Sequence, residues 1–326
     1  MKLYQINKNL FMFIPSGTAM LNANVYIIKD NINAIIDTGT STTLGKNLFL
    51  RILKSLRIKK IDKIIITHTH QDHYSNAGFF QELFNCEILA HPSGIPILLR
   101  GNKGIDIKDF EYLEFFETAF PIINKKRINR APIKNFITFG YKLYLGKVKQ
   151  VKKVKILNDN DTISFGNLEM KILHTPGHSH DSICIYELKS KILFTGDTVP
   201  FTPYLGTSIT DIINSIQKLI NYKHQIRFVF RGHGYRTHPW CEELPLYLTF
   251  LDSIKRAEKR ILLGLKLKGP MKLHKIVPLM YERTHQGHQR FYKLMRTDNM
   301  WALKYLQDLE EKKLIKKDEN QKYYLI

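Results

Sequence analysis

The segment Thr67–Gly78 reads "THTHQDHYSNAG" and directly follows the apolar run "KIII". It places three histidines and one aspartate within six positions. A short isoleucine-rich run predicts a buried β-strand, and polar groups at strand ends commonly form binding or catalytic sites. His68 and His70 are two positions apart, so they project to the same side of an extended chain. Asp72 and His73 follow where the chain turns into a helix, and both pairs should face one small volume.

Neutral imidazole nitrogens and a carboxylate are ligands that suit zinc, and also iron or manganese. One histidine in such a place is usually a structural residue, but an HxHxDH run at a strand end specifically indicates a metal site. One turn of chain cannot supply every ligand, so other strand-end loops should contribute. His178 in "TPGHSHDS", Asp197 in "FTGDT" and His233 in "FRGHG" each follow a β-like run. We expect Asp197 to bridge two cations, because a carboxylate has two oxygens.

The pattern along the chain predicts an α/β fold. Runs rich in β-branched residues end in polar, Gly-containing loops, and two amphipathic helical patterns intervene. Strands mixed with helices, each strand delivering polar groups from its end, indicate an α/β sandwich with the site along one edge of its sheets. The predicted strands lie in the stretches 24–39, 63–67, 168–179, 182–198 and 226–234, and the helices in 43–58 and 208–226.

Length and composition are those of an enzyme-sized globular protein. The chain has 326 residues and 44% apolar content, enough for one large domain and a smaller one. Cys86, Cys184 and Cys241 match no disulfide or CxxC framework, so we expect free thiols. The first thirty residues contain no long uninterrupted apolar run, which predicts a cytoplasmic protein with no membrane segment.

The net charge of +21 is unevenly distributed. Residues 121–155 contain eleven Lys or Arg and no acidic residue, and much of the remaining excess lies beyond Ser253. Such segments favour RNA, DNA or an anionic small molecule as partner. The simpler alternative is a solvated basic surface, because lysine is frequent throughout the chain.

These residues, in this order, resemble the metallo-β-lactamase superfamily. The resemblance covers roughly residues 1–250 and includes five motifs: Asp37 in "IIDTG", the HxHxDH run, His178, Asp197 and His233. It implies an αββα sandwich that holds two divalent cations. The implied ligand sets are His68, His70 and His178 for one metal, and Asp72, His73 and His233 for the other, with Asp197 between them.

The resemblance also implies that Asp37 orders the ligand loop through hydrogen bonds without binding metal. An ordinary turn carboxylate before Gly39 is the alternative. Within the superfamily, the sequence is most similar to the hydrolase group that includes glyoxalase II, lactonases and lactamase-like proteins with a C-terminal helical domain.

Residues 251–326 form the predicted second domain. Three helical patterns and a final β-like turn resemble a winged helix, with the longest helix of this part expected near Met300–Leu314. That helix carries Asp308, Glu310 and Glu311, which disfavour entry into a phosphate-lined groove. The alternative is a module that packs on the catalytic domain or forms a homodimer.

An insertion falls at about residues 101–155, because His73 and His178 are 105 residues apart. Its first part, "DFEYLEFFETAF", is acidic and aromatic, and its second part is basic and aromatic. We expect a partial lid over the metals. Aromatic side chains that only pack the insertion onto the sandwich, or a nucleic-acid-binding surface, are the alternatives.

The predicted function is that of a binuclear-metal hydrolase acting on a small acyl substrate, with zinc the expected metal. A hydroxide bridging the two metals would attack an ester, thioester or lactone carbonyl, and Asp72 would orient it and pass its proton to the leaving group. Tyr204 or His180 are candidates to polarise the substrate oxygen. An endoribonuclease that uses the same centre is the alternative function. A nucleic-acid-binding regulator with a vestigial centre is disfavoured by the complete ligand set.

Overall fold

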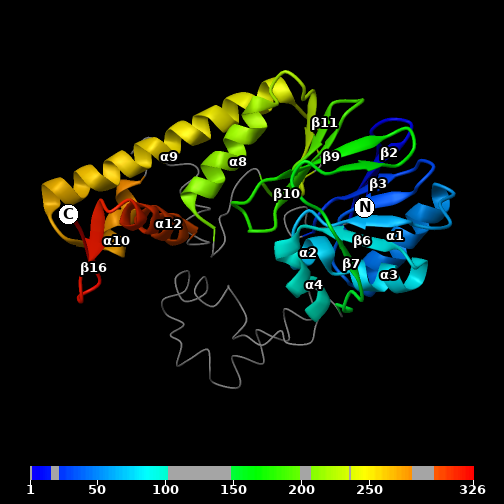
Figure 1. Ribbon diagram of the computed structural model, residues 1–326, viewed down its shortest axis with the longest axis horizontal. Helices are drawn as coiled ribbons and strands as arrows, with labels where there is room; N and C mark the ends of the chain where they lie inside the picture. Colours follow the sequence, from blue (N-terminus) through cyan, green and yellow to red (C-terminus); the bar gives the residue numbers. More distant parts are fainter. Residues whose placement is uncertain (1, 16–21, 102–147, 199–206, 235, 281–296) are drawn as a thin grey trace.

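The computed structural model describes residues 2–15, 22–101, 148–198, 207–234, 236–280 and 297–326. Two mixed β-sheets pack face to face, and helices cover their outer faces (Figure 1). Most of the predicted insertion and the candidate Tyr204 lie outside the described residues.

The first sheet comes from the N-terminal half of the chain. Its seven strands are hydrogen-bonded in sequence order, antiparallel from β1 to β4 and parallel from β4 to β7. The strands β2, β3 and β4 are buried along their whole length, as expected for a sheet covered on both faces. The strands are β1 (Lys2–Gln5), β2 (Leu10–Ile14), β3 (Val25–Ile28), β4 (Ala34–Ile36), β5 (Lys63–Ile65), β6 (Glu87–Ala90) and β7 (Val154–Ile156).

The second sheet has the order β13-β12-β11-β10-β9-β8. Only β11 and β12 pair in parallel, and the other neighbours are antiparallel. The strands are β8 (Thr162–Ser164), β9 (Glu169–His174), β10 (Ile183–Glu187), β11 (Ile192–Phe194), β12 (Phe228–Phe230) and β13 (His238–Pro239).

Three apolar layers hold the sandwich together. The central layer lies between the sheets and includes Tyr26, whose ring centroid is 4.8 Å from that of Phe194. On the first outer face, α1 (Thr43–Ser55) and α3 (Ala77–Phe84) pack on the first sheet, and α4 (Ile95–Arg100) follows β6. On the second outer face, α8 (Ile209–Asn221) buries residues at helical spacing against the other sheet. This order of layers confirms the predicted αββα sandwich.

The strand directions bring the predicted site residues to one edge. The neighbours β4 and β5 are parallel, and so are β11 and β12, so each pair ends at a common edge of its sheet. The strand β9 is antiparallel to β10, which is antiparallel to β11, so β9 also ends at that edge. The loops after these five strands carry the polar motifs identified in the sequence.

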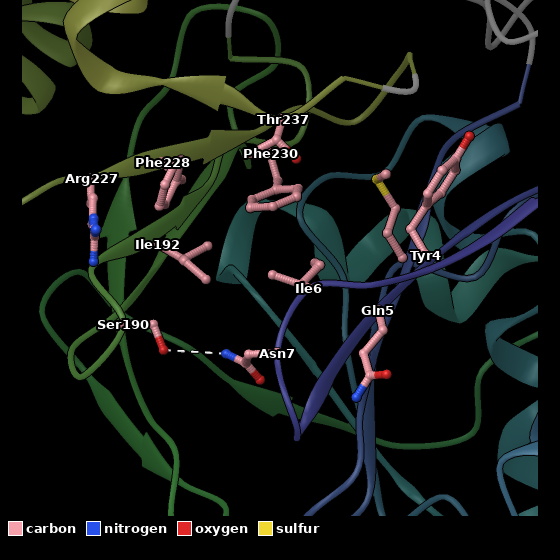
Figure 2. A pocket seen from close by; sticks show the side chains of 11 residues that line it. Tyr4, Gln5, Ile6, Asn7, Ser190, Ile192, Arg227, Phe228, Phe230 and Thr237 are labelled. Carbon is pink, nitrogen blue, oxygen red and sulfur yellow. Dashed lines mark hydrogen bonds between the residues drawn. The ribbon is translucent and has the colours of Figure 1, made fainter.

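A separate pocket of about 500 Å³ opens between the sheets near the N-terminal strand (Figure 2). It is lined by Ile6 beside β1, and by Ile192 and Phe228 at the first positions of β11 and β12. Asn7 donates a hydrogen bond to Ser190 across it, at 3.2 Å. None of the sequence-predicted site residues lines this pocket.

The helix α9 (Trp240–Lys268) runs from the sandwich into the C-terminal part of the chain (Figure 1). It has 29 residues and crosses position 250, the predicted end of the catalytic domain. It is longer than α12 (Thr297–Glu311), so the expectation that the longest helix of this part lies near Met300–Leu314 is wrong. The reason is that the face of α9 that packs on the apolar core continues across the expected boundary, from Trp240 through the partly buried Phe250 and Leu251 to Leu265. None of the described helices combines the length and apolarity needed to cross a membrane.

Beyond α9, the chain forms a small sheet with short helices. The three strands have the order β14-β16-β15 and are antiparallel. Both α10 and α12 pack beside them. The elements are β14 (Met271–Lys272), α10 (Leu273–Ile276), the 3₁₀ turn η3 (Val277–Leu279), α12, β15 (Ile315–Lys317) and β16 (Lys322–Leu325).

Candidate metal centre

Three histidines converge at the carboxyl-end edge of the sandwich. His68 follows β5, His70 is the extended residue that begins α2 (Gln71–Tyr74), and His178 lies in the loop after β9. The Nδ1 atom of His70 is 2.9 Å from Nε2 of His68 and 2.7 Å from Nε2 of His178. These residues, here called the three-histidine cluster, point one ring nitrogen each at a common volume.

A second group, here called the mixed cluster, consists of Asp72, His73 and His233. The first two lie on α2, and His233 lies in the loop after β12. Oδ2 of Asp72 is 3.1 Å from Nε2 of His233 and 3.7 Å from Nε2 of His73. His73 is fully buried, whereas about a fifth of Asp72 and a quarter of His233 are exposed, so the mixed cluster borders solvent.

Asp197 lies between the two clusters. Its Oδ2 atom is 3.2 Å from Nε2 of His233 and 3.6 Å from Nε2 of His178, and its Oδ1 atom is 3.5 Å from Nε2 of His73. One carboxylate therefore reaches a member of each cluster, which is the geometry expected of a bridging ligand. All seven side chains that the sequence predicts as metal ligands are thus brought together.

The donor set fits metal cations. A neutral imidazole has one N–H and one lone pair, so three ring nitrogens that converge within hydrogen-bonding distance cannot all satisfy one another. The Nε2 atom of His73 is buried and has no hydrogen-bond partner. Buried polar atoms are rarely left unpaired, and a cation would satisfy these lone pairs. The His/Asp cluster is consistent with a binuclear metal site, and nitrogen and oxygen ligands of this kind suit zinc, iron or manganese.

The structure places Asp37 directly behind the ligands. Its Oδ1 atom accepts a hydrogen bond from the Thr67 backbone N–H at 2.8 Å, and its Oδ2 atom accepts one from the Thr67 hydroxyl at 2.8 Å. Oδ2 also lies 2.7 Å from Nδ1 of His73. Asp37 has a left-handed backbone, with φ of 59°, which aspartate tolerates better than most residues. Its contacts therefore go to the ligand loop, as the resemblance implies.

The electrostatics divide the histidines into two kinds. Burial and the neighbouring imidazoles lower the pKa of His68 and His70 well below the usual range, so both stay neutral and able to bind a cation. Burial acts in the same direction on His73, but the carboxylates of Asp197 and Asp72 outweigh it and raise its pKa. In the same way, Asp197 outweighs burial and raises the pKa of His233 to about 10. Cations that bind the mixed cluster must therefore displace protons.

Several supporting residues were not identified from the sequence. The Thr69 backbone N–H donates to Oδ2 of Asp181 at 2.8 Å, which ties the HxHxDH segment to the loop that carries His178. The side-chain amide of Asn76 donates to the carbonyls of Thr38 and Thr40, each at 2.8 Å. Asp181 stands in the quoted motif "TPGHSHDS", three positions after His178, but nothing in the sequence distinguishes it from an ordinary loop carboxylate.

Glycines allow the loops to approach the site closely. A Cβ added at Gly232 would lie 2.2 Å from Oδ1 of Asp197 and 2.8 Å from Cε1 of His73. Gly196 has φ of 49°, and a Cβ there would lie 2.8 Å from Oγ1 of Thr67. A side chain at position 232 would therefore occupy space that the ligands fill.

The remaining sequence candidates are less central. The side chain of His180 is exposed, and its carbonyl lies 2.8 Å from Nε2 of His174. In the basic segment 121–155, the described residues Lys149, Lys152 and Lys153 are exposed. Lys149 forms an ion pair with Glu82 at 2.6 Å.

Comparison with known proteins agrees with this site. The family model for the "Metallo-beta-lactamase superfamily" matches residues 19–233, a range that contains all seven clustered side chains and Asp37. The human protein "Acyl-coenzyme A thioesterase MBLAC2" is 28% identical over 237 residues, 68% of this chain and 75% of that protein. A "Probable metallo-hydrolase" of Methanocaldococcus jannaschii is 28% identical over 222 residues, 65% of this chain and 88% of that protein.

The fold is also similar to solved structures. A metallo-beta-lactamase family protein from Thermus thermophilus aligns with a TM-score of 0.67 at 17% identity. The alignment covers 99% of this chain and 100% of that chain. The likeness in fold therefore extends beyond the sandwich into the C-terminal part.

Proposed function

The chain belongs to the metallo-β-lactamase superfamily as a metal-dependent hydrolase, and from this premise we propose that it hydrolyses an acyl ester, thioester or lactone, with a thioester preferred. The observation that carries the proposal is the convergence of seven His and Asp side chains at one edge of the sandwich. The three-histidine cluster would hold one cation and the mixed cluster the other, with Asp197 shared. Zinc is the proposed metal, and iron and manganese are the alternatives.

Two divalent cations at these residues would supply a strong nucleophile at neutral pH, because such ions lower the pKa of water from near 16 to about 7. Asp72 is the residue that we propose to move the proton. Burial alone would raise the pKa of its carboxyl, but His73 and His233 outweigh burial and lower it. Asp72 is therefore ionised at neutral pH and borders solvent, so it can accept a proton from water and return it to the leaving group.

A thioester is preferred for two reasons. The human relative is named an acyl-coenzyme A thioesterase and is similar over two thirds of this chain. A thiol has a pKa of about 8.5, so a thiolate leaves with little help from an acid. Asp72, with its lowered pKa, is rarely protonated at neutral pH, so it is better matched to a leaving group that needs little protonation than to an alkoxide.

The test is a substrate panel on the full chain loaded with zinc, iron or manganese. An acyl-CoA thioester, an oxygen ester with the same acyl group, a lactone and a single-stranded RNA would be compared, with a chelator-treated sample as control. We expect metal-dependent thioester hydrolysis, with kcat/KM at least about tenfold above that for the ester. Failure of every acyl substrate with a metal-loaded protein would refute the proposal.

An endoribonuclease is the second candidate, and the basic segment 121–155 is the observation that favours it. We also propose that residues 251–326 form a winged-helix-like domain, which the order of α10, α12, β15 and β16 supports. Glu310 and Glu311 are exposed on α12, and they weaken the case that this helix binds nucleic acid. A small acyl substrate therefore remains the first proposal.

A further inference from the structure

The loop that carries His178 is held by α8. The Thr207 hydroxyl donates to the carbonyl of Gly177 at 2.7 Å, and the Ser215 hydroxyl donates to the carbonyl of Pro176 at 2.6 Å. Both hydroxyl-bearing residues are buried. The two residues that precede His178 are therefore fixed by side chains from α8 and from the residue just before its cap.

Direct packing makes this support rigid. Gly177 has φ of 149°, and a Cβ added to it would lie 2.8 Å from Cγ1 of Ile212 on α8. The start of α8 is itself fixed by a capping box, in which Ser208 and Asp211 exchange side-chain-to-backbone hydrogen bonds. A displacement of the first turn of α8 would therefore displace the backbone next to His178.

The C-terminal helix α12 contacts this same first turn. Lys304 is only 4% exposed, and its ammonium group donates a hydrogen bond to the carbonyl of Thr207. One turn further along α12, Asp308 is 3% exposed and accepts a hydrogen bond from the Thr210 hydroxyl at 3.2 Å. Lysine and aspartate are rarely this buried. A hydrogen bond from a buried ammonium group fixes the position of the accepting carbonyl more strictly than apolar packing does, because it is both strong and directional.

We propose that Lys304 is a positioning residue that, through Thr207 and Gly177, holds His178 in the three-histidine cluster. The C-terminal part of the chain is then a structural component of the metal centre. This inference rests on the proposed role of His178 as a ligand. The inference predicts weakened metal binding at the three-histidine cluster only, because other elements support the mixed cluster. Asp37 contacts His73. Asn24 donates hydrogen bonds to the carbonyls of Arg231 and Gly234, which flank His233.

The test compares Lys304→Met with Lys312→Met, a control on the same helix. Lys312 is 43% exposed and pairs with Asp308 and Glu258, so its loss removes two ion pairs without touching Thr207. Affinity for each of two zinc equivalents would be measured by chelator competition on the full chain. Residues that orient metal ligands typically contribute a factor of 10 to 100 in affinity, so Lys304→Met should weaken one equivalent by about tenfold or more. Lys312→Met should leave both equivalents unchanged.

Thr207→Val and Thr207→Ser form a second pair that is independent of the buried charge. Valine has the shape of threonine but lacks the hydroxyl that donates to Gly177, whereas serine keeps that donor. Thr207→Val should lower the affinity for the same zinc equivalent, and Thr207→Ser should keep the wild-type affinity. Thermal unfolding of the metal-free proteins would show whether each variant folds, and this pair still decides the question if Lys304→Met does not fold.

The benchmark is His178→Ala, which should lose the zinc equivalent that Lys304→Met weakens. If the two residues act through one path, adding Lys304→Met to His178→Ala should cause no further loss of zinc affinity. Equal weakening of both equivalents, or unchanged affinity in Lys304→Met and Thr207→Val, would overturn the inference while the hydrolase proposal stands. A wild-type chain that binds no divalent metal would overturn both.

Discussion

The Nδ1 atom of His73 lies 2.7 Å from Oδ2 of Asp37, and both side chains are buried. A carboxylate can only accept hydrogen bonds, so once a cation has displaced the proton on Nε2, the contact keeps the remaining ring proton on Nδ1 and directs the Nε2 lone pair into the mixed cluster. Histidine ligands of metals are commonly oriented in this way by a carboxylate. Asp37 also accepts two hydrogen bonds from Thr67, so one side chain sets both the tautomer of His73 and the position of the ligand loop.

Asp37→Asn should therefore weaken metal binding at the mixed cluster by about 10- to 100-fold. Asparagine has nearly the same shape and tolerates the left-handed backbone of position 37. Its amide, however, has only one accepting oxygen, whereas the donors from Thr67 and His73 use both carboxylate oxygens of Asp37. Zinc affinity measured by competition would check the effect, with Asp62→Asn at the opposite end of β5 as control. If Asp37→Asn bound zinc with wild-type affinity, Asp37 would be an ordinary turn carboxylate with no role in orienting the ligands.

The purified chain should carry close to two metal ions, and Asp197→Ala should retain fewer. The reason is that the Asp197 carboxylate reaches both His178 and His233, at 3.6 and 3.2 Å, and has two oxygens to share between two cations, whereas each imidazole offers one lone pair. Metal content by elemental analysis after gel filtration would provide the measurement. A single tightly bound iron that survives the substitution would contradict the binuclear site.

Asp72→Asn should lower turnover by about 10²- to 10⁴-fold, the usual contribution of a positioned acid or base. The change keeps the shape of the side chain but removes its ability to accept a proton, and it weakens the mixed cluster as a ligand set. Asp72 is partly exposed, so the fold should survive, and circular dichroism would verify this. Unchanged turnover on the preferred substrate would remove Asp72 from the mechanism.

The sequence predicts this site well because its main features are local. The spacing of His68, His70 and His73 is a property of one strand end and one helical turn, and it can be inferred without knowing the rest of the fold. His178, Asp197 and His233 each follow an apolar run, and parallel strands deliver such residues to a common edge.

The residues that support the ligands could not be predicted in this way. The hydrogen bond between Thr69 and Asp181 joins residues 112 positions apart, and the bond from Lys304 to Thr207 joins residues 97 apart. No periodic pattern marks either pair, since each depends on how whole elements pack. For the same reason, the length of α9 could not be predicted, because the extent of its buried face depends on the elements that pack against it.

Gly232→Ala should disrupt the metal centre although it adds only one methyl group. The new Cβ would overlap with Oδ1 of Asp197 and press on the ring of His73. We expect zinc affinity to fall by at least about tenfold, as when a residue that orients ligands is altered. Gly269→Ala is the control for a methyl group added away from the ligands: its Cβ position has open space, and its φ of 73° adds a backbone strain that Gly232, which has no positive φ, does not carry. Equal zinc affinity in the two variants would show that contact with the ligands is unimportant.

Charge reversal in the basic segment separates the two enzymatic proposals. The change is Lys149→Glu, Lys152→Glu and Lys153→Glu together with Lys125→Glu, Lys126→Glu and Arg127→Glu, the last three outside the described residues. If RNA is the substrate, these side chains neutralise phosphates, and RNA affinity should disappear in the variant. Wild-type binding should then weaken steeply with salt, because about 0.7 counterions are released for each phosphate contact on a single strand.

If a small acyl group is the substrate, the same variant should hydrolyse a neutral ester or lactone almost as fast as the wild type. Lys149, Lys152 and Lys153 are exposed, and charges farther than about 8 Å are screened at physiological ionic strength. The neutral substrate matters here, because an acyl-CoA carries phosphates of its own and would respond to the lost lysines even without RNA binding. We expect retained turnover on the neutral substrate, and salt-sensitive RNA cleavage that vanishes in the variant would instead establish the ribonuclease.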